Sequence, residues 1–217
     1  MKIAILGTGT VGETIGSKLV EMGHNVKMGS RTSDNEKAKK FVDKHHAKAS
    51  SGTFEEAAAF AEIVFNCTAG VASLEALKLA GEHNLEGKII VDIANPLDFS
   101  KGMPPSLSIV NTNSLGEEIQ KAFAGAKVVK ALNTMWCGLM VNPGMINNGD
   151  HQTFVCGNDA AAKKQVQEIL QSFGWQEQNI LDLGDISKAR ATEMYLPLWL
   201  SIYGATSCGA FNMKLVK

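Results

Sequence analysis

The residues best suited to chemistry stand at the start of the chain, in the segment Gly7-Thr8-Gly9-Thr10-Val11-Gly12. In this G-x-G-x-x-G spacing, Gly7 allows a tight turn, Gly9 lets backbone approach a pyrophosphate, and Gly12 permits close packing of a helix on a strand. A helix that begins here presents free N–H groups and its positive dipole end to phosphate. The spacing therefore predicts a dinucleotide site formed by Gly7, Thr8, Gly9, Thr10, Val11 and Gly12.

A second group, Ser30 and Arg31, follows the next predicted strand. An NAD site usually has Asp or Glu at this point to hold the ribose hydroxyls, but the first acid here is Asp34. A guanidinium beside a serine hydroxyl favours a 2′-phosphate through charge-assisted hydrogen bonds. Lys37 is predicted to add a further phosphate contact. These residues indicate NADP(H) rather than NAD(H), the alternative being that Arg31 is an ordinary solvated loop residue.

No arrangement of residues for acid–base catalysis, nucleophilic catalysis or metal binding stands out, so no catalytic residue and no metal ligand is predicted. The five histidines, among them His151, are interpreted as solvated. Cys67 and Cys137 lie near expected strand ends, where ligands bind in open α/β sheets, but are interpreted as small buried or rim residues rather than redox thiols. Tyr195 and Trp199 belong to a helical stripe typical of a core or a dimer interface.

Strands and helices that alternate along the chain must position these residues. Short apolar runs predict strands at 2–6, 25–28, 62–68, 88–93 and 127–132. Helices are predicted after the glycine segment and at 34–46, 53–61, 71–82 and 114–124. Two of them, at 53–61 and 114–124, open with capping boxes at Thr53 and Ser114. An irregular loop over 95–113 is long enough to be functional. The alternation predicts an α/β, Rossmann-type doubly wound parallel sheet.

From about residue 133 the pattern changes to a small C-terminal α/β extension that ends in a helix. Strands are predicted at 152–156 and 179–183, and a helix at 159–173. A last helix is predicted to start after Asp185, which is placed as its N-cap, and to continue to about residue 205. We therefore expect an NADP-binding Rossmann domain over residues 1–133 and an extension over 134–217 that completes the acceptor site.

Composition limits the classes of partner. The net charge of −1 argues against nucleic acid, and no apolar run reaches membrane-spanning length, so no membrane partner is expected. The four cysteines form no C-x-x-C pair, which favours reduced thiols and a cytoplasmic protein.

The chain resembles the NADP oxidoreductases that reduce the deazaflavin coenzyme F420. It is also similar to the cytosolic reductase domain of the six-transmembrane epithelial metalloreductases. The resemblance covers essentially the whole chain. It rests on the glycine segment, Gly29-Ser30-Arg31, Asn95-Pro96, residues 128–134, residues 154–159 and Pro197-Leu198-Trp199. It departs from the F420 reductases at Asn133 and Trp136, where the family pattern carries His and Pro.

The resemblance implies NADP(H) as cofactor and a homodimer or higher homo-oligomer. The residues implied to meet the nicotinamide half of the cofactor, or the acceptor beside it, are Thr68, Ala69, Ala94, Asn95 and Cys137. Those implied to contact the acceptor are Asn133, Thr134, Met135 and Trp136. F420 carries phosphate and carboxylate charges, for which Lys188 and Arg190 are available as cations.

The sequence therefore favours an NADPH-dependent oxidoreductase that transfers hydride between NADP(H) and a small planar, flavin-like acceptor: F420, a flavin or a quinone. Two alternatives stay open. One is a dehydrogenase of the β-hydroxyacid or pyrroline-carboxylate type, although such enzymes usually add a larger helical domain. The other is a non-catalytic NADP(H)-binding sensor, since a fold does not by itself imply catalysis.

Overall fold

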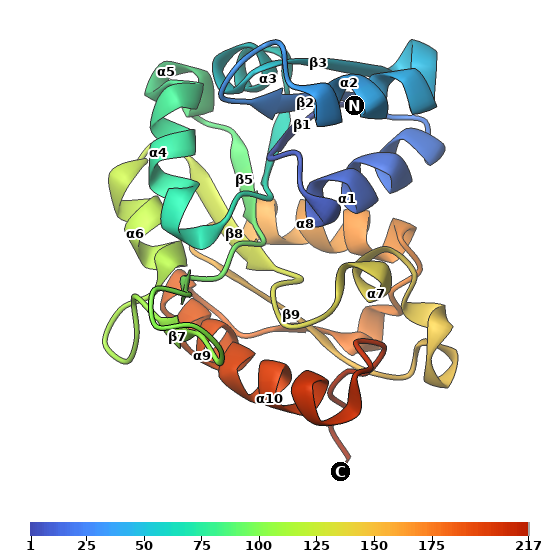
Figure 1. The fold of residues 1–217 in the computed structure, drawn as a ribbon, viewed down its shortest axis with the longest axis vertical. Helices are drawn as coiled ribbons and strands as arrows, with labels where there is room; N and C mark the ends of the chain where they lie inside the picture. The colour runs from blue at the N-terminus through green and yellow to red at the C-terminus, as the bar shows by residue number, and fades with distance from the viewer. Residues whose placement is uncertain (217) are drawn as a thin grey trace.

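The computed structural model describes residues 1–216, which form an eight-stranded sheet between two layers of helices (Figure 1). The strands of this sheet are β1 (Lys2–Leu6), β2 (Asn25–Ser30), β3 (Ala49–Thr53), β4 (Ile63–Asn66), β5 (Ile89–Asp92), β8 (Lys127–Ala131), β9 (Thr153–Gly157) and β10 (Ile180–Asp182). Their spatial order is β10-β9-β8-β5-β4-β1-β2-β3. The predicted Rossmann-type α/β fold is confirmed.

The strand directions differ from a fully parallel sheet at one edge. The six strands from β3 to β8 are parallel, whereas β9 pairs antiparallel with β8, and β10 is parallel to β9. The connection from β8 to β9 holds only the short helix α7 (Cys137–Val141) and two 3-10 turns. It returns the chain at the same end of the sheet instead of crossing it, so β9 runs back along β8.

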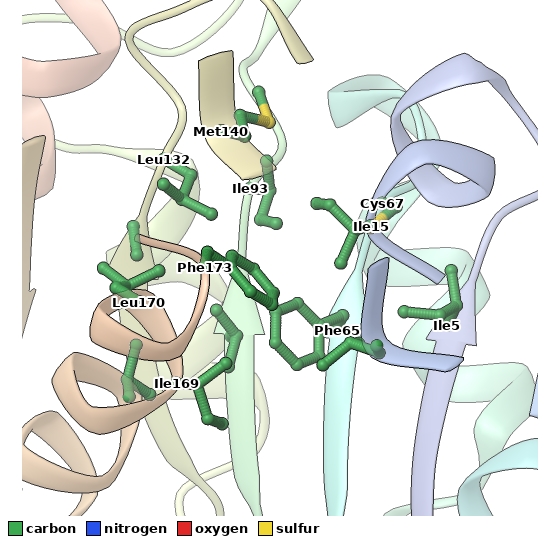
Figure 2. Close-up of a cluster of buried hydrophobic side chains, with 14 of the residues drawn as sticks. Ile5, Ile15, Phe65, Cys67, Ile93, Leu132, Met140, Ile169, Leu170 and Phe173 are labelled. Atoms are coloured by element: carbon green, nitrogen blue, oxygen red, sulfur yellow. The ribbon is translucent and has the colours of Figure 1, made fainter. Parts of the chain in front are cut away.

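Two hydrophobic cores lie on opposite faces of the sheet. One face is covered by α1 (Thr10–Glu21), α2 (Glu36–His45), α7 and α8 (Ala160–Ser172). The other is covered by α3 (Phe54–Phe60), α4 (Gly70–Ala80), α5 (Glu82–Leu85), α6 (Leu115–Ala122) and α9 (Ala189–Met194). Figure 2 shows the first core, where Ile15 of α1, Met140 of α7 and Ile169 of α8 gather over sheet residues such as Phe65. Burying these side chains from water is the main force that holds the layers together.

Helix starts follow the sequence signals closely. Thr53 Oγ1 accepts a hydrogen bond from the Glu56 N–H at 3.1 Å, and the Glu56 carboxylate accepts one from the Thr53 N–H at 2.8 Å. This is the predicted capping box at the start of α3, and it is confirmed. Asp185 is also a cap as predicted, since its carboxylate accepts from the Ser187 N–H at 2.9 Å.

Three local features differ from the sequence predictions. Strand β3 was not predicted, because Ala49–Thr53 has no β-branched or aromatic run and is held at the sheet edge by pairing with β2. The loop over 95–113 contains a small hairpin of β6 (Leu97–Asp98) and β7 (Ser106–Leu107). The last helix is divided into a 3-10 turn, α9 and α10 (Leu196–Thr206). The break between α9 and α10 falls where Pro197 lacks the N–H that a continuous helix needs.

The segment after α10 returns to the start of β9. Met213 O accepts from the Gln152 N–H at 2.9 Å, and the Asn212 amide donates to Gln152 O at 2.8 Å. His151 lies beneath this contact, only 2% exposed, with Nε2 2.9 Å from Pro143 O. The interpretation of His151 as solvated is therefore wrong: a turn in the sequence does not reveal that a distant segment covers it.

Residues on both sides of the predicted boundary at 133 share one sheet and one core, as Val129 and Val155 do. The division into 1–133 and 134–217 stays a prediction. Within residues 1–216, none of the helices combines the length and apolar character needed to cross a bilayer.

Candidate functional site

The connections between strands run to opposite sides of β1, and this reversal creates a crevice at the ends of the strands. From β1 the chain passes to β2 on one side, whereas β4 pairs with β1 on the other. Ligands of open α/β sheets bind at such a switch point, outside the carboxyl ends of the strands. The turns after β1 and β4 touch there: Gly7 has φ +115°, and a Cβ at Gly7 would lie 2.6 Å from Cys67 O. Only glycine satisfies both the conformation and the contact.

The N-terminus of α1 opens onto this crevice. A Cβ at Gly12 would lie 2.3 Å from Gly7 O, whereas one at Gly9 would meet nothing within 4 Å. Gly12 thus allows helix and turn to pack, and Gly9 leaves the outer side of the loop open. Gly9 is the N-cap of this 12-residue helix and offers no capping side chain, so the first N–H groups have no side-chain acceptor. This donor set fits the pyrophosphate of a dinucleotide.

Three adjoining pockets make up the crevice. The α4 pocket, about 300 Å³, lies between Gly9, Phe54 and α4 residues that include Glu75 and Leu79. The arginine pocket, about 460 Å³, is lined by Thr8, Ser30, Arg31, Thr32 and Asn35, among others. The hairpin pocket, about 250 Å³, is lined by Val11, Val71, Ile93, Ala94, Asn95, Leu97 and Phe99, among others. Thr8 and Arg31 also line the α4 pocket, and so do Thr68 and Ala69, which line the hairpin pocket. The three therefore form one elongated groove.

The arginine pocket has a free cation. Arg31 is exposed and takes part in none of the ion pairs found within residues 1–216. Asp34, the nearest acid after Arg31 in sequence, is paired with Lys39. Ser30 is buried and its hydroxyl donates to Thr32 O at 2.5 Å, which fixes the turn. Lys37 does not line this pocket, and its predicted phosphate contact stays a prediction.

The hairpin pocket brings together some of the residues implied to meet the nicotinamide half or the acceptor, and not others. Thr68, Ala69, Ala94 and Asn95 line it. Cys137, Asn133, Thr134 and Met135 are buried, and Trp136 is 40% exposed; none of these five lines the pocket. Sequence reasoning did not identify Val71, Leu97 or Phe99 as site residues. The length of the loop over 95–113 was the one signal that pointed to Leu97 and Phe99.

Asn133 supports the pocket indirectly. Its amide donates to Asn95 Oδ1 at 2.8 Å, and the Asn95 amide donates to Asn133 O at 2.8 Å. This reciprocal pair joins the turn after β5 to the turn after β8. It fixes the orientation of Asn95 at the pocket wall.

The Cys67 thiol at the site is not activated. Cys67 lines two of the pockets, and burial raises the pKa of its thiol well above the ordinary value. Cys137 packs in the first core. Cys67 therefore acts as a small buried residue, because a protonated thiol is a poor nucleophile, and Cys137 is a core residue. Within residues 1–216, no three His, Cys, Asp or Glu side chains are arranged to hold a metal ion.

A buried ion triad lies directly beneath the hairpin pocket. Lys130 Nζ lies 2.8 Å from Asp92 Oδ2 and 2.7 Å from Glu193 Oε1, with all three side chains at most 1% exposed. Lys130 also donates to Ala94 O at 2.5 Å. Burial by itself would lower the pKa of Lys130, but the two carboxylates outweigh it and raise the pKa above its ordinary value. Lys130 therefore carries its charge inside the protein.

Each carboxylate of the triad has further donors. Glu193 accepts the N–H groups of Leu115 and Gly116 at 2.8 and 3.0 Å, at the start of α6. Asp92 Oδ1 accepts from the Asn66 amide at 2.8 Å, and Asn66 Oδ1 accepts from the Thr68 hydroxyl at 2.7 Å. The network thus runs from the pocket wall at Thr68 to the break between α9 and α10.

Arg190 is occupied elsewhere. Its guanidinium donates to both oxygens of the Glu117 carboxylate, at 2.8 and 2.5 Å, and so holds α9 against the start of α6. The hydrogen bond and charge of Arg190 hold the pKa of Glu117 below its ordinary value. Arg190 is therefore a structural residue and not a free cation for an anionic acceptor.

We expect Glu117→Gln to lower the free energy of unfolding by about 1 kcal/mol at neutral pH, a value reduced for partial exposure of the pair. Because the pKa of Glu117 is lower in the folded state, the pair stabilises the protein at pH values above the ordinary pKa of 4.5. That stabilisation is lost as the pH falls through the folded-state pKa. The difference between wild type and variant should therefore vanish in acid. Urea unfolding across pH 3 to 8 measures this stability difference, with Glu55→Gln at an exposed position as the control. A difference that stays constant across this pH range would contradict the prediction.

Comparison with known proteins agrees with this geometry. The family described as "NADP oxidoreductase coenzyme F420-dependent" matches residues 2–96. A crystal structure from Arthrobacter sp. FB24, assigned as an F420-dependent NADP-reductase, is 50% identical over the whole of both chains, with a TM-score of 0.94. A reductive aminase from Aspergillus terreus, solved with NADPH and ethyl levulinate, shares the fold at 19% identity, with a TM-score of 0.66 over 95% of this chain and 62% of its own.

Among curated relatives, Metalloreductase STEAP3 of Rattus norvegicus is 28% identical over 91% of this chain. The chain spans 38% of the length of that relative. The resemblance expected from the glycine segment, Ser30-Arg31 and Asn95-Pro96 is therefore confirmed in both of its parts. The chain belongs to the family of coenzyme F420-dependent NADP oxidoreductases and is an NADP-dependent oxidoreductase.

Proposed function

We propose that this protein passes hydride between NADP(H) and a small planar acceptor, either a deazaflavin, a flavin or a quinone. The observation that carries the proposal is the exposed guanidinium of Arg31 beside Ser30, in a groove that also contains the open glycine turn. A 2′-phosphate at this point gains a charge-assisted contact with the Arg31 guanidinium, because no carboxylate within the described residues is paired with Arg31. The family membership supports the same cofactor.

The groove suggests how NADP(H) would lie. Its pyrophosphate would meet the Thr8–Val11 turn and the N-terminus of α1, and its 2′-phosphate would meet Ser30 and Arg31. The ribose and nicotinamide would then extend past Thr68 and Ala69 toward Ala94 and Asn95. The bound cofactor supplies the hydride. The residues of this chain supply position, because hydride transfer depends mainly on holding two rings at close range.

The test is Arg31→Ala. We expect NADPH binding to weaken by about 1.5–3 kcal/mol, the scale of a hydrogen bond to a charged group, with NADH binding nearly unchanged. Calorimetric titration of both cofactors measures this, and Lys40→Ala on α2 is a control that removes a nearby charge outside the groove. Equal losses for NADPH and NADH would overturn the assignment of Arg31.

Measurement of turnover distinguishes a reductase from a dehydrogenase of another type and from a regulatory sensor. Oxidation of NADPH followed at 340 nm with F420, flavin and quinone supports a reductase. Turnover with a keto acid or cyclic imine supports a dehydrogenase of the β-hydroxyacid or pyrroline-carboxylate type instead. Tight binding of NADPH with no turnover would support the sensor.

A further inference from the structure

We infer that the hairpin pocket receives the acceptor and that Phe99 is the residue that selects it, favouring acceptors whose reacting part is an uncharged fused ring. The inference rests on the proposed function, because the reactive end of NADP(H) is placed at Thr68, Ala94 and Asn95. It adds a specificity-determining residue for that acceptor.

Two exposed apolar side chains carry the inference. Val71, at the start of α4, is 69% exposed, and Phe99, just after β6, is 56% exposed. They come from separate elements, yet both line the hairpin pocket with Leu97. Large apolar side chains that gather at the rim of a pocket mark a surface that a ligand covers.

The position of Phe99 is well defined by its neighbours. The Leu97 N–H donates to Asn95 O at 2.8 Å, and the Ser108 N–H donates to Pro96 O at 2.8 Å, so both arms of the hairpin are tied to the pocket wall. The Asp98 carboxylate accepts the Ser100 N–H at 2.8 Å, which closes a turn around Phe99. The ring of Phe99 is therefore presented at the pocket by a fixed turn.

The charge of the lining indicates the acceptor class. Within residues 1–216, no Lys, Arg, His, Asp or Glu side chain lines the hairpin pocket, whereas the arginine pocket has Arg31 and the α4 pocket has both Arg31 and Glu75. A keto acid or an imine carboxylate would leave its anion without a partner there, which is unfavourable. An uncharged ring instead gains contact with Val71 and Phe99, in the stacked or edge-on geometries that aromatic rings prefer.

The reaction balances without a further group. For a quinone, NADPH loses one hydride and becomes NADP⁺, and the quinone takes up that hydride and one proton from water to become the hydroquinone. Two electrons move in this one step. No charged side chain is needed at the ring itself.

The experiment compares Phe99→Ala with Phe99→Tyr, which keeps the ring, and with Met103→Ala, which removes an exposed side chain of the same hairpin outside the pocket. Protein saturated with NADP⁺ is titrated with riboflavin, whose fluorescence reports binding without turnover. The specificity constant kcat/KM is then measured with menadione and with pyruvate. We expect Phe99→Ala to weaken riboflavin binding and to lower kcat/KM for menadione about tenfold, with NADPH affinity unchanged within about twofold. Phe99→Tyr and Met103→Ala should behave like wild type.

Other results separate the possible failures. Wild-type kcat/KM and riboflavin affinity in Phe99→Ala would overturn the inference and leave the proposed function intact. Wild-type protein that does not bind NADPH would overturn the proposed function itself. A preference for pyruvate over menadione would overturn the uncharged acceptor class. If sedimentation showed that Phe99→Ala dissociates an oligomer while riboflavin binding is unchanged, a second copy of the chain would be the occupant, and the inference would be overturned.

Discussion

Replacing Lys130 by methionine should lower the free energy of unfolding by about 3–5 kcal/mol, the loss typical when one partner of a buried ion pair is removed. The reason is that Asp92 and Glu193 would remain buried without their cation, each at most 1% exposed. Methionine fills the volume of the lysine stem, so the loss reports charge more than packing. Urea unfolding followed by circular dichroism measures the change.

Two further variants make this prediction specific. Lys127→Met, on the same strand but in a partly exposed pair with Asp159, should change stability by less than about 1 kcal/mol. The double variant Lys130→Met/Glu193→Gln should be more stable than Lys130→Met alone, because it removes one uncompensated charge. Equal stability of Lys130→Met and wild type would show that the triad is not energetically coupled.

The second large effect is expected at Gly12. Alanine there would place Cβ 2.3 Å from Gly7 O, so α1 must move away from the turn. We expect a loss of about 3 kcal/mol in the free energy of unfolding, at the upper end for overpacking, together with loss of NADPH binding. Thermal unfolding and cofactor titration measure the two effects separately.

Gly9→Ala is the matched control. A Cβ at Gly9 meets nothing within 4 Å, and its φ of −80° suits alanine, so stability should be unchanged or slightly raised. NADPH affinity should still fall about tenfold, because the methyl group would occupy the open side of the turn that the pyrophosphate approaches. If Gly9→Ala bound NADPH as tightly as wild type, the pyrophosphate would have to lie elsewhere.

The first half of the fold follows from local sequence. An apolar strand, the glycine turn and the helix that it opens are specified by neighbouring residues, and so is the capping box at Thr53. The structure places β1, α1 and β2 accordingly. The groove at Gly7, Ser30 and Arg31 was predictable for the same reason, because strand ends in an α/β sheet meet at one edge.

The remainder depends on contacts between distant residues. In the sequence, Lys130 is one polar residue in an otherwise apolar strand. No neighbouring residue in the sequence indicates that Asp92 and Glu193 surround it in the fold. The reversal of β9 depends on a return connection, and β3 depends on its neighbour β2. The acceptor contacts predicted at Asn133–Trp136 stay a prediction, as does the homo-oligomer, and the pocket itself is lined by residues 11–99.

The paired amides of Asn95 and Asn133 have a consequence for how such a protein can diverge. Each residue completes the polar contacts of the other, so a change at one position alone leaves an unmatched group inside the molecule. Any residue that replaces Asn133 must therefore offer Asn95 Oδ1 another donor, so the two positions constrain each other. Libraries that redesign this enzyme should randomise them as a unit.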